Sequence, residues 1–139
     1  MSLQNQTIII TGASRGIGKA LALTLAKDGS NLSLVARNHQ ELLEVKKEAE
    51  ALGAKVLIFS GSVADEELVK KVVTETAQTF GKIDALVNNA GFGVFKQAAE
   101  ITTHEWDSIF ETNVKGTFLF CREVVPFMKN SGQGHIVNI

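Results

Sequence analysis

Short runs of apolar residues alternate along this chain with longer stretches in which apolar residues recur every three or four positions. Five runs are almost continuously apolar, which is typical of parallel strands that are covered on both faces. They span residues 8–10, 32–36, 56–59, 85–87 and 136–137. The stretches between them have the spacing of helices that bury one face. We therefore expect strands and helices to alternate along the whole chain.

Four helical regions are predicted between these strands. Asp65 is a predicted N-cap for the third helix, and Pro126, the only proline, predicts a kink or an early end of the fourth. The apolar stripes are Ile17, Leu21 and Leu25 in the first helix, Leu42, Val45, Ala49 and Leu52 in the second, and Val69, Val72, Val73, Ala77 and Phe80 in the third. The fourth region, about 103–130, carries Trp106, Phe110, Val114, Phe118 and Val125.

The alternation predicts an α/β fold. Right-handed crossovers would join the strands into a Rossmann-like, doubly wound parallel sheet of about five strands. The sequence has no repeat, linker or low-complexity stretch, so we expect one domain over residues 1–139. The chain reaches Ile139 within the fifth predicted strand, and we therefore expect the sheet to be truncated after that strand, with an exposed edge.

Charge and composition exclude several classes of protein. The 14 basic residues are balanced by 15 acidic ones, so no basic excess would attract nucleic acid or anionic lipid. One cysteine and three well-separated histidines have no metal-ligand spacing, and no metal site is expected. No signal peptide precedes Thr7 and no apolar run reaches membrane-spanning length, so the default expectation is a cytoplasmic protein.

Three glycines follow the first predicted strand and open the first predicted helix. Gly12 permits a sharp turn, while Gly16 and Gly18 remove side chains where a pyrophosphate would approach the backbone and where the helix packs on the sheet. Free N–H groups and the positive end of the helix dipole would then face an anion. This context predicts a dinucleotide site; a glycine-rich turn without a ligand is the alternative. The spacing does not fit the phosphate-binding loop of nucleoside triphosphatases.

The end of the second strand distinguishes the two nicotinamide dinucleotides. An NAD-binding domain usually has an acidic residue there to bind the ribose 2′-hydroxyl, whereas this chain has Arg37 followed by Asn38. A guanidinium can hold a 2′-phosphate by charge-assisted hydrogen bonds, and Arg15 in the glycine turn supplies a second cation. Each arginine alone could be a solvated surface residue, but the two together favour NADP(H).

Four motifs, in order, resemble the short-chain dehydrogenase/reductase family. They are Thr-Gly-Ala-Ser-Arg-Gly-Ile-Gly at 11–18, Asn-Asn-Ala-Gly at 88–91, Asn113 within Glu-Thr-Asn-Val, and Gly-His-Ile-Val-Asn-Ile at 134–139. The resemblance covers the whole chain and is nearest to NADP-preferring members such as 3-oxoacyl-carrier-protein reductases. An ordinary strand-ending turn remains the alternative for 88–91, and a tolerated polar residue in a helix is the alternative for Asn113.

The resemblance implies a set of site residues. Arg37 and Asn38 would meet the 2′-phosphate, and Ser62 and Val63 would lie near adenine, although the family usually has aspartate where Ser62 stands. Asn113 would be catalytic, bending its helix and binding a water in a proton relay. The pyrophosphate and its neighbouring ribose would contact Gly12, Ser14, Arg15, Gly16, Ile17 and Gly18. The adenosine ribose would contact Asn89, Ala90 and Gly91, which would also support the central sheet.

The resemblance also implies an oxidoreductase that transfers hydride between NADPH and a carbonyl or alcohol. The serine, tyrosine and lysine of the family's catalytic set have no counterpart in these 139 residues, which contain no tyrosine. We therefore expect the isolated chain to bind NADP(H) and to be inactive. A non-catalytic dinucleotide-binding or interaction module and a fragment without function stay open. The apolar fourth helix, a subunit contact in the family, predicts a homo-oligomer.

Overall fold

Five short strands form one parallel sheet in the computed structural model, which describes residues 3–139. The strands are β1 (Thr7–Thr11), β2 (Asn31–Ala36), β3 (Val56–Ser60), β4 (Ala85–Asn88) and β5 (His135–Asn138). Their order in the sheet is β3-β2-β1-β4-β5, and each neighbouring pair is parallel. The doubly wound parallel sheet predicted from the apolar runs is confirmed. β5 forms one edge of this sheet, as expected.

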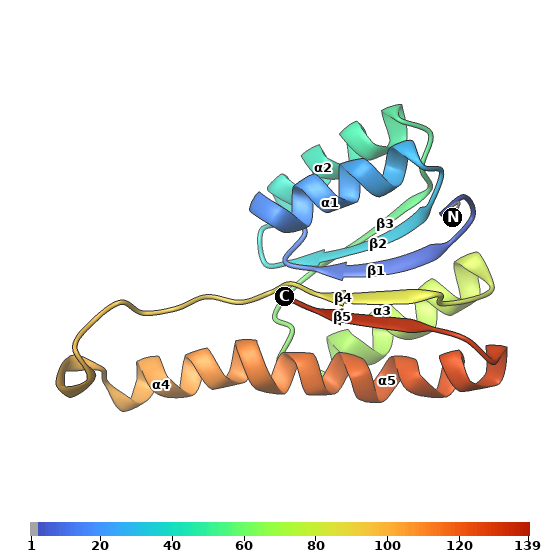
Figure 1. The fold of residues 1–139 in the computed structure, drawn as a ribbon. Coiled ribbons are helices and arrows are strands. Elements are labelled where there is room, and N and C mark those ends of the chain that lie inside the picture. Colours follow the sequence, from blue (N-terminus) through green and yellow to red (C-terminus); the bar gives the residue numbers. More distant parts are fainter. Residues whose placement is uncertain (1–2) are drawn as a thin grey trace.

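Helices cover both faces of the sheet (Figure 1). The helices α1 (Gly16–Lys27) and α2 (His39–Ala51) lie on one face. The helices α3 (Glu66–Phe80) and α5 (Gly116–Ser131) lie on the other. The core is correspondingly divided in two. Successive side chains of a strand point to opposite faces, so Ile8 and Ile10 of β1 pack with α1 and α2, whereas Ile9 packs with α3 and α5.

The predicted fourth helix is one continuous helix made of three segments. These are α4 (Thr103–Phe110), a π-helical turn at Glu111–Lys115, and α5. A 3₁₀ turn, Ala98–Glu100, precedes them. Pro126 lies inside α5, which runs on to Ser131, so the predicted early end of the helix is wrong. Packing of Leu119, Phe120, Val124 and Met128 in the core offsets the one backbone hydrogen bond that proline removes.

In the apolar stripes predicted for the first three helices, two residues are exposed. Ile17, in the first turn of α1, is 62% exposed, and Leu52, the C-cap residue of α2, is 41% exposed. The buried face of α1 consists instead of Gly18, Ala22, Leu25 and Ala26. Asp65 caps α3 as predicted, since its carboxylate accepts the backbone N–H groups of Glu67 and Leu68.

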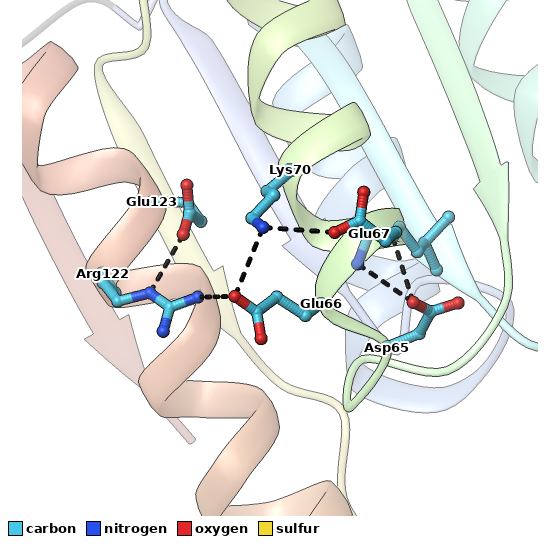
Figure 2. A network of polar contacts seen from close by, with 7 residues as sticks. Asp65, Glu66, Glu67, Lys70, Arg122 and Glu123 are labelled. Atoms are coloured by element: carbon cyan, nitrogen blue, oxygen red, sulfur yellow. Dashed lines mark hydrogen bonds and ion pairs between the residues drawn. The ribbon is translucent and has the colours of Figure 1, made fainter.

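An exposed ionic network joins α3 to α5 (Figure 2). The Arg122 guanidinium of α5 lies 2.7 Å from the Glu66 carboxylate of α3 and 3.0 Å from that of Glu123. Lys70 bridges Glu66 and Glu67 on α3 itself. The hydrogen bond from Arg122 lowers the pKa of Glu66. Because exposed ion pairs contribute little free energy, the network orients the two helices while their shared apolar core stabilises them.

No helix in residues 3–139 has both the length and the uninterrupted apolar character needed to cross a bilayer. The same residues contain no group of three or more histidine, cysteine or acidic side chains that could hold a metal ion.

Candidate functional site

An open cleft of about 1060 Å³ lies at the carboxyl ends of the strands. The chain order reverses between β1 and β4, which are neighbours in the sheet, and such a switch point is where open α/β sheets bind ligands. Twelve of the fourteen predicted site residues line this cleft. They are Gly12, Ser14, Arg15, Ile17, Arg37, Asn38, Ser62, Val63, Asn89, Ala90, Gly91 and Asn113.

The remaining two, Gly16 and Gly18, shape the turn without lining the cleft. A Cβ atom on Gly18 would lie 2.2 Å from the carbonyl oxygen of Gly12, so α1 can approach the turn only because Gly18 has no side chain. Gly12 has a φ of +64°, and a Cβ there would lie 2.9 Å from the Cα atom of Ala90. Gly16 has a φ of +56° with open space around it, so its requirement is conformational rather than steric.

The N-terminus of α1 faces the cleft without a side-chain cap. Asn38, Asp65 and Thr102 cap α2, α3 and α4, but no side chain among the described residues 3–139 caps α1. Within the same part of the chain, the N–H groups of Gly16 and Ile17 have no hydrogen-bond acceptor. Unpaired N–H groups at a helix N-terminus are donors for an anion, and the helix dipole adds to the attraction.

The hydroxyl of Thr11 connects β1 to the segment after β4. Its Oγ1 atom accepts the N–H groups of Asn89 and Ala90, each at 3.0 Å. The side-chain amide of Asn89 donates in return to the carbonyl oxygens of Thr11 and Gly12, each at 3.1 Å. Asn89 therefore holds the glycine turn against β4. The resemblance implied both a ribose contact for Asn89 and support of the central sheet, and these bonds show how the support is made.

Thr11→Val should destabilise the chain by about 2–4 kcal/mol, because valine keeps the shape but leaves two partly buried N–H groups without an acceptor. Thr11→Ser keeps the acceptor and should lose about 1 kcal/mol, mainly for the missing methyl group. Urea denaturation followed by circular dichroism measures both. Equal midpoints for the two variants would show that the hydroxyl contributes nothing.

The cationic side chains of the cleft are free of carboxylate partners. Neither Arg15 nor Arg37 makes an ion pair with any residue in 3–139, and both are exposed. Asn38 uses its Oδ1 atom to accept the N–H group of Glu41, 3.1 Å away. The Ser62 hydroxyl similarly accepts the N–H group of Ala64. The arginines are therefore available to an anionic ligand, whereas Asn38 and Ser62 already have a structural role.

Asn113 lies at the centre of the π-helical turn. Its Oδ1 atom accepts the N–H group of Phe92 at 3.1 Å, and its Nδ2 atom donates to the carbonyl oxygen of Phe92 at 2.9 Å. The Thr117 hydroxyl donates to the main-chain carbonyl oxygen of Asn113. The side-chain amide thus pairs with the Phe92 backbone as a neighbouring β-strand would, and it fixes one wall of the cleft. Pi-helical turns of this kind occur frequently at functional sites.

The loop between β4 and α4 is also held at its far end. Glu105 forms a capping box with Thr102 at the start of α4 and pairs with Lys96 of the loop. The Lys96 ammonium, together with the Thr102 N–H group, lowers the pKa of Glu105 to about 2. The loop therefore has one attachment at Phe92, through Asn113, and another at Lys96.

The ion pair at Glu105 predicts a pH dependence. Because its pKa in the folded chain lies below the ordinary value of 4.5, the pair should stabilise the fold above pH 4.5 and be lost as the pH falls toward 2. Carbon-detected NMR of the Glu105 carboxyl group measures the midpoint. Lys96→Met should raise this midpoint toward 4.5, and Lys47→Met, on α2, should leave it unchanged. A wild-type midpoint at 4.5 would contradict the prediction.

Several lining residues were not predicted from the sequence. Asn88 and Asn138 end β4 and β5 and are joined by a 2.9 Å hydrogen bond between their side-chain amides. Glu41 belongs to the first turn of α2. The one sequence signal for Glu41 was its position three residues after the N-cap Asn38, which places it in the first turn of the helix. The full set is Ala36, Glu41, Gly61, Asn88, Phe92, Thr112, Thr117, Asn138 and Ile139.

Comparison with known proteins agrees with this architecture. A family model described as short chain dehydrogenase matches residues 6–139. Hydroxysteroid dehydrogenase-like protein 2 of Rattus norvegicus is 40% identical, over 96% of this chain and 27% of its own length. The 3-oxoacyl-(acyl-carrier-protein) reductase of Thermotoga maritima is 37% identical, over 100% of this chain and 56% of its own length. The chain thus spans between about a quarter and about half of these relatives.

Two solved structures carry different dinucleotides on the same fold. A NAD⁺-bound xylitol dehydrogenase superposes with a TM-score of 0.94 at 30% identity, covering 99% of this chain and 54% of the other. A metagenomic short-chain oxidoreductase in complex with NADP superposes with a TM-score of 0.93 at 34% identity, covering 99% and 63%. The fold therefore accommodates either cofactor, and the choice between them depends on individual side chains.

Proposed function

Because the chain belongs to the short-chain dehydrogenase family, we propose that it is the NADP(H)-binding portion of an oxidoreductase acting on a carbonyl or alcohol substrate. One observation carries this proposal. The uncapped N-terminus of α1 and two unpaired arginines, Arg15 and Arg37, line a single cleft at the switch point of the sheet. A ligand with both a pyrophosphate and a further phosphate matches that distribution of donors and positive charge.

The residues present fit such a ligand. The unpaired N–H groups of Gly16 and Ile17 at the start of α1 would hold the pyrophosphate, and the open space at Gly16, which has no side chain, leaves this backbone accessible. Arg37 and Arg15 would hold the 2′-phosphate, and Val63, whose side chain is buried in the core, would offer its backbone N–H group to adenine. Asn89, through its bonds to Thr11 and Gly12, would keep the turn in shape.

Within the catalytic reaction, this chain would bind and orient the cofactor. NADPH, when bound, would supply the hydride. Asn113 would keep the wall of the cleft at Phe92 in position through its side-chain amide. The main-chain carbonyl group of Asn113 lies in the π-helical turn, where the regular hydrogen-bond pattern of the helix is shifted. A proton donor must also be positioned for carbonyl reduction. The tyrosine that the resemblance implies for this role is not among the 139 residues.

Titration of the protein, with its 139-residue mass verified, into NADPH would test the proposal. We expect weak but saturable binding, detected as a change in NADPH fluorescence, and no oxidation of NADPH when a carbonyl compound is added. Binding without turnover also fits a non-catalytic dinucleotide-binding module. Repeating the assay with a polypeptide that carries the remaining catalytic residues would distinguish this module from the cofactor-binding portion of an enzyme. The absence of any binding would favour a fragment without function, and robust turnover would contradict the inactive assignment.

A second proposal concerns self-association. Trp106, Phe110, Val114 and Phe118 form an apolar stripe along α4, the π-helical turn and α5, and all four side chains are exposed. Asp107, Glu111 and Lys115 flank a shallow hollow on it. We propose that this stripe buries its apolar area against a second copy of the chain.

Sedimentation of the wild-type protein should show a dimer or larger species. Trp106→Glu should dissociate this species, whereas the control Thr74→Glu, on the exposed surface of α3, should not.

A further inference from the structure

A carboxylate shares the cleft with the two unpaired arginines. Glu41 is half-buried in the first turn of α2, and its N–H group is held by the N-cap Asn38. Farther along the same helix, Glu48 and Glu50 pair with Lys19 and Lys46. Among residues 3–139, by contrast, the Glu41 carboxylate forms no ion pair, even though it lines the same cleft as Arg15 and Arg37. Glu41 therefore adds to the lining of the cleft a negative charge that no ion pair neutralises.

This carboxylate has opposite effects on the two forms of the adenosine ribose. A 2′-phosphate carries between one and two negative charges near pH 7 and would be repelled by a neighbouring carboxylate. An unmodified 2′-hydroxyl is a neutral donor, which a carboxylate can accept. The arginines favour the first ligand and Glu41 favours the second, so the balance of the three side chains decides the preference.

We propose that Glu41 opposes binding of the 2′-phosphate and thereby limits the preference for NADP(H) over NAD(H) that Arg15 and Arg37 create. This inference rests on the proposed dinucleotide-binding function of the cleft. It makes Glu41 a specificity-determining residue, although Glu41 lies on α2 and not at the end of β2, where the sequence directs attention to Arg37.

A purely structural role makes a different prediction. An acidic side chain in the first turn of a helix interacts favourably with the helix dipole. If that were the whole role of Glu41, its replacement would lower the stability of α2 and weaken both adenosine ligands to the same extent. A change in the ratio of the two affinities is therefore the measurement that separates the two roles.

Adenosine 2′,5′-bisphosphate and 5′-AMP are suitable probes, because they differ only in the 2′-phosphate. Their dissociation constants would be measured by NMR titration or calorimetry at low ionic strength for wild type, Glu41→Gln and the control Glu44→Gln. Glu44 is exposed on the same helix and does not line the cleft. Glu41→Gln should bind the bisphosphate about three- to tenfold tighter, while 5′-AMP binds equally or more weakly. The gain should shrink at high ionic strength.

The outcomes distinguish a failure of the proposed function from a failure of the role proposed for Glu41. If wild-type protein binds neither probe, the proposed function and the inference both fail. If wild type binds the probes but Glu41→Gln shifts both equally, or behaves like Glu44→Gln, the proposed function survives and the role of Glu41 is overturned. Thermal unfolding of each variant verifies that it is folded, and Glu41→Asp, which keeps the charge, should restore most of the wild-type ratio.

Discussion

Gly18→Ala should destabilise the chain by about 3 kcal/mol or more and abolish NADPH binding. Helix propensity alone predicts the opposite sign, because alanine inside a helix is favoured over glycine by about 1 kcal/mol. A steric clash of the new side chain outweighs this helix preference at Gly18. The new Cβ atom would lie 2.2 Å from the Gly12 carbonyl oxygen and 2.6 Å from the Asn89 amide nitrogen. Since the closer atom belongs to the backbone of the turn, α1 and the turn would have to separate.

Urea denaturation and NADPH titration would measure the two losses. Gly93→Ala is the matched control, because a Cβ atom there would meet only the Phe95 ring at 3.6 Å, an ordinary contact. The control should keep its unfolding midpoint close to that of wild type. A Gly18→Ala midpoint at or above the wild-type value would show that the turn can relax, and that the close approach of α1 is not required.

Arg37→Asp should weaken NADPH binding about 10- to 100-fold and change NADH binding by no more than about threefold. Each charge-assisted hydrogen bond to a phosphate contributes about 1.5–3 kcal/mol, and the new carboxylate would add repulsion to that loss. NADH lacks the 2′-phosphate, and an aspartate at this position can accept its ribose hydroxyl.

Competition between the two cofactors, followed by fluorescence, measures this ratio. Lys47→Asp introduces the same change of net charge on exposed α2 surface and should leave the ratio unchanged. A uniform loss of both cofactors in Arg37→Asp would indicate that Arg37 supports the fold of the β2–α2 junction and does not recognise the phosphate.

The elements of the fold could be predicted because their signals are local. Each buried strand is a short apolar run, and Asp65 precedes its helix in the usual position for a cap. The π-helical turn has no such signal in the periodicity, although the resemblance implied that Asn113 bends its helix. Trp106, Phe110, Val114 and Phe118 keep a spacing of four residues across it, so the sequence is compatible with an uninterrupted α-helix. At the turn, the side chain of Asn113 pairs with Phe92, 21 residues earlier, and such a long-range contact leaves no mark on the periodicity.

The candidate site could be predicted where a residue follows directly on a strand. The glycine turn, Arg37, Ser62 and the segment after β4 all come from strand ends, and parallel strands bring those ends to one edge. Glu41 and Thr117 reach the cleft from helices, where the direction of a side chain depends on the helix orientation. Ile17 belongs to the predicted apolar stripe and to the predicted site, and it lines the cleft with 62% of its surface exposed, so periodicity alone would have misplaced it.

The bare start of α1 gives the molecule a built-in reporter. Its amide protons at Gly16 and Ile17 have no acceptor within residues 3–139, so in the ligand-free chain they should exchange rapidly with deuterated solvent. An anion seated on them would slow that exchange without any rearrangement of the helix. Two backbone resonances would then give the occupancy of the cleft directly, whichever dinucleotide is present and whether or not hydride transfer takes place.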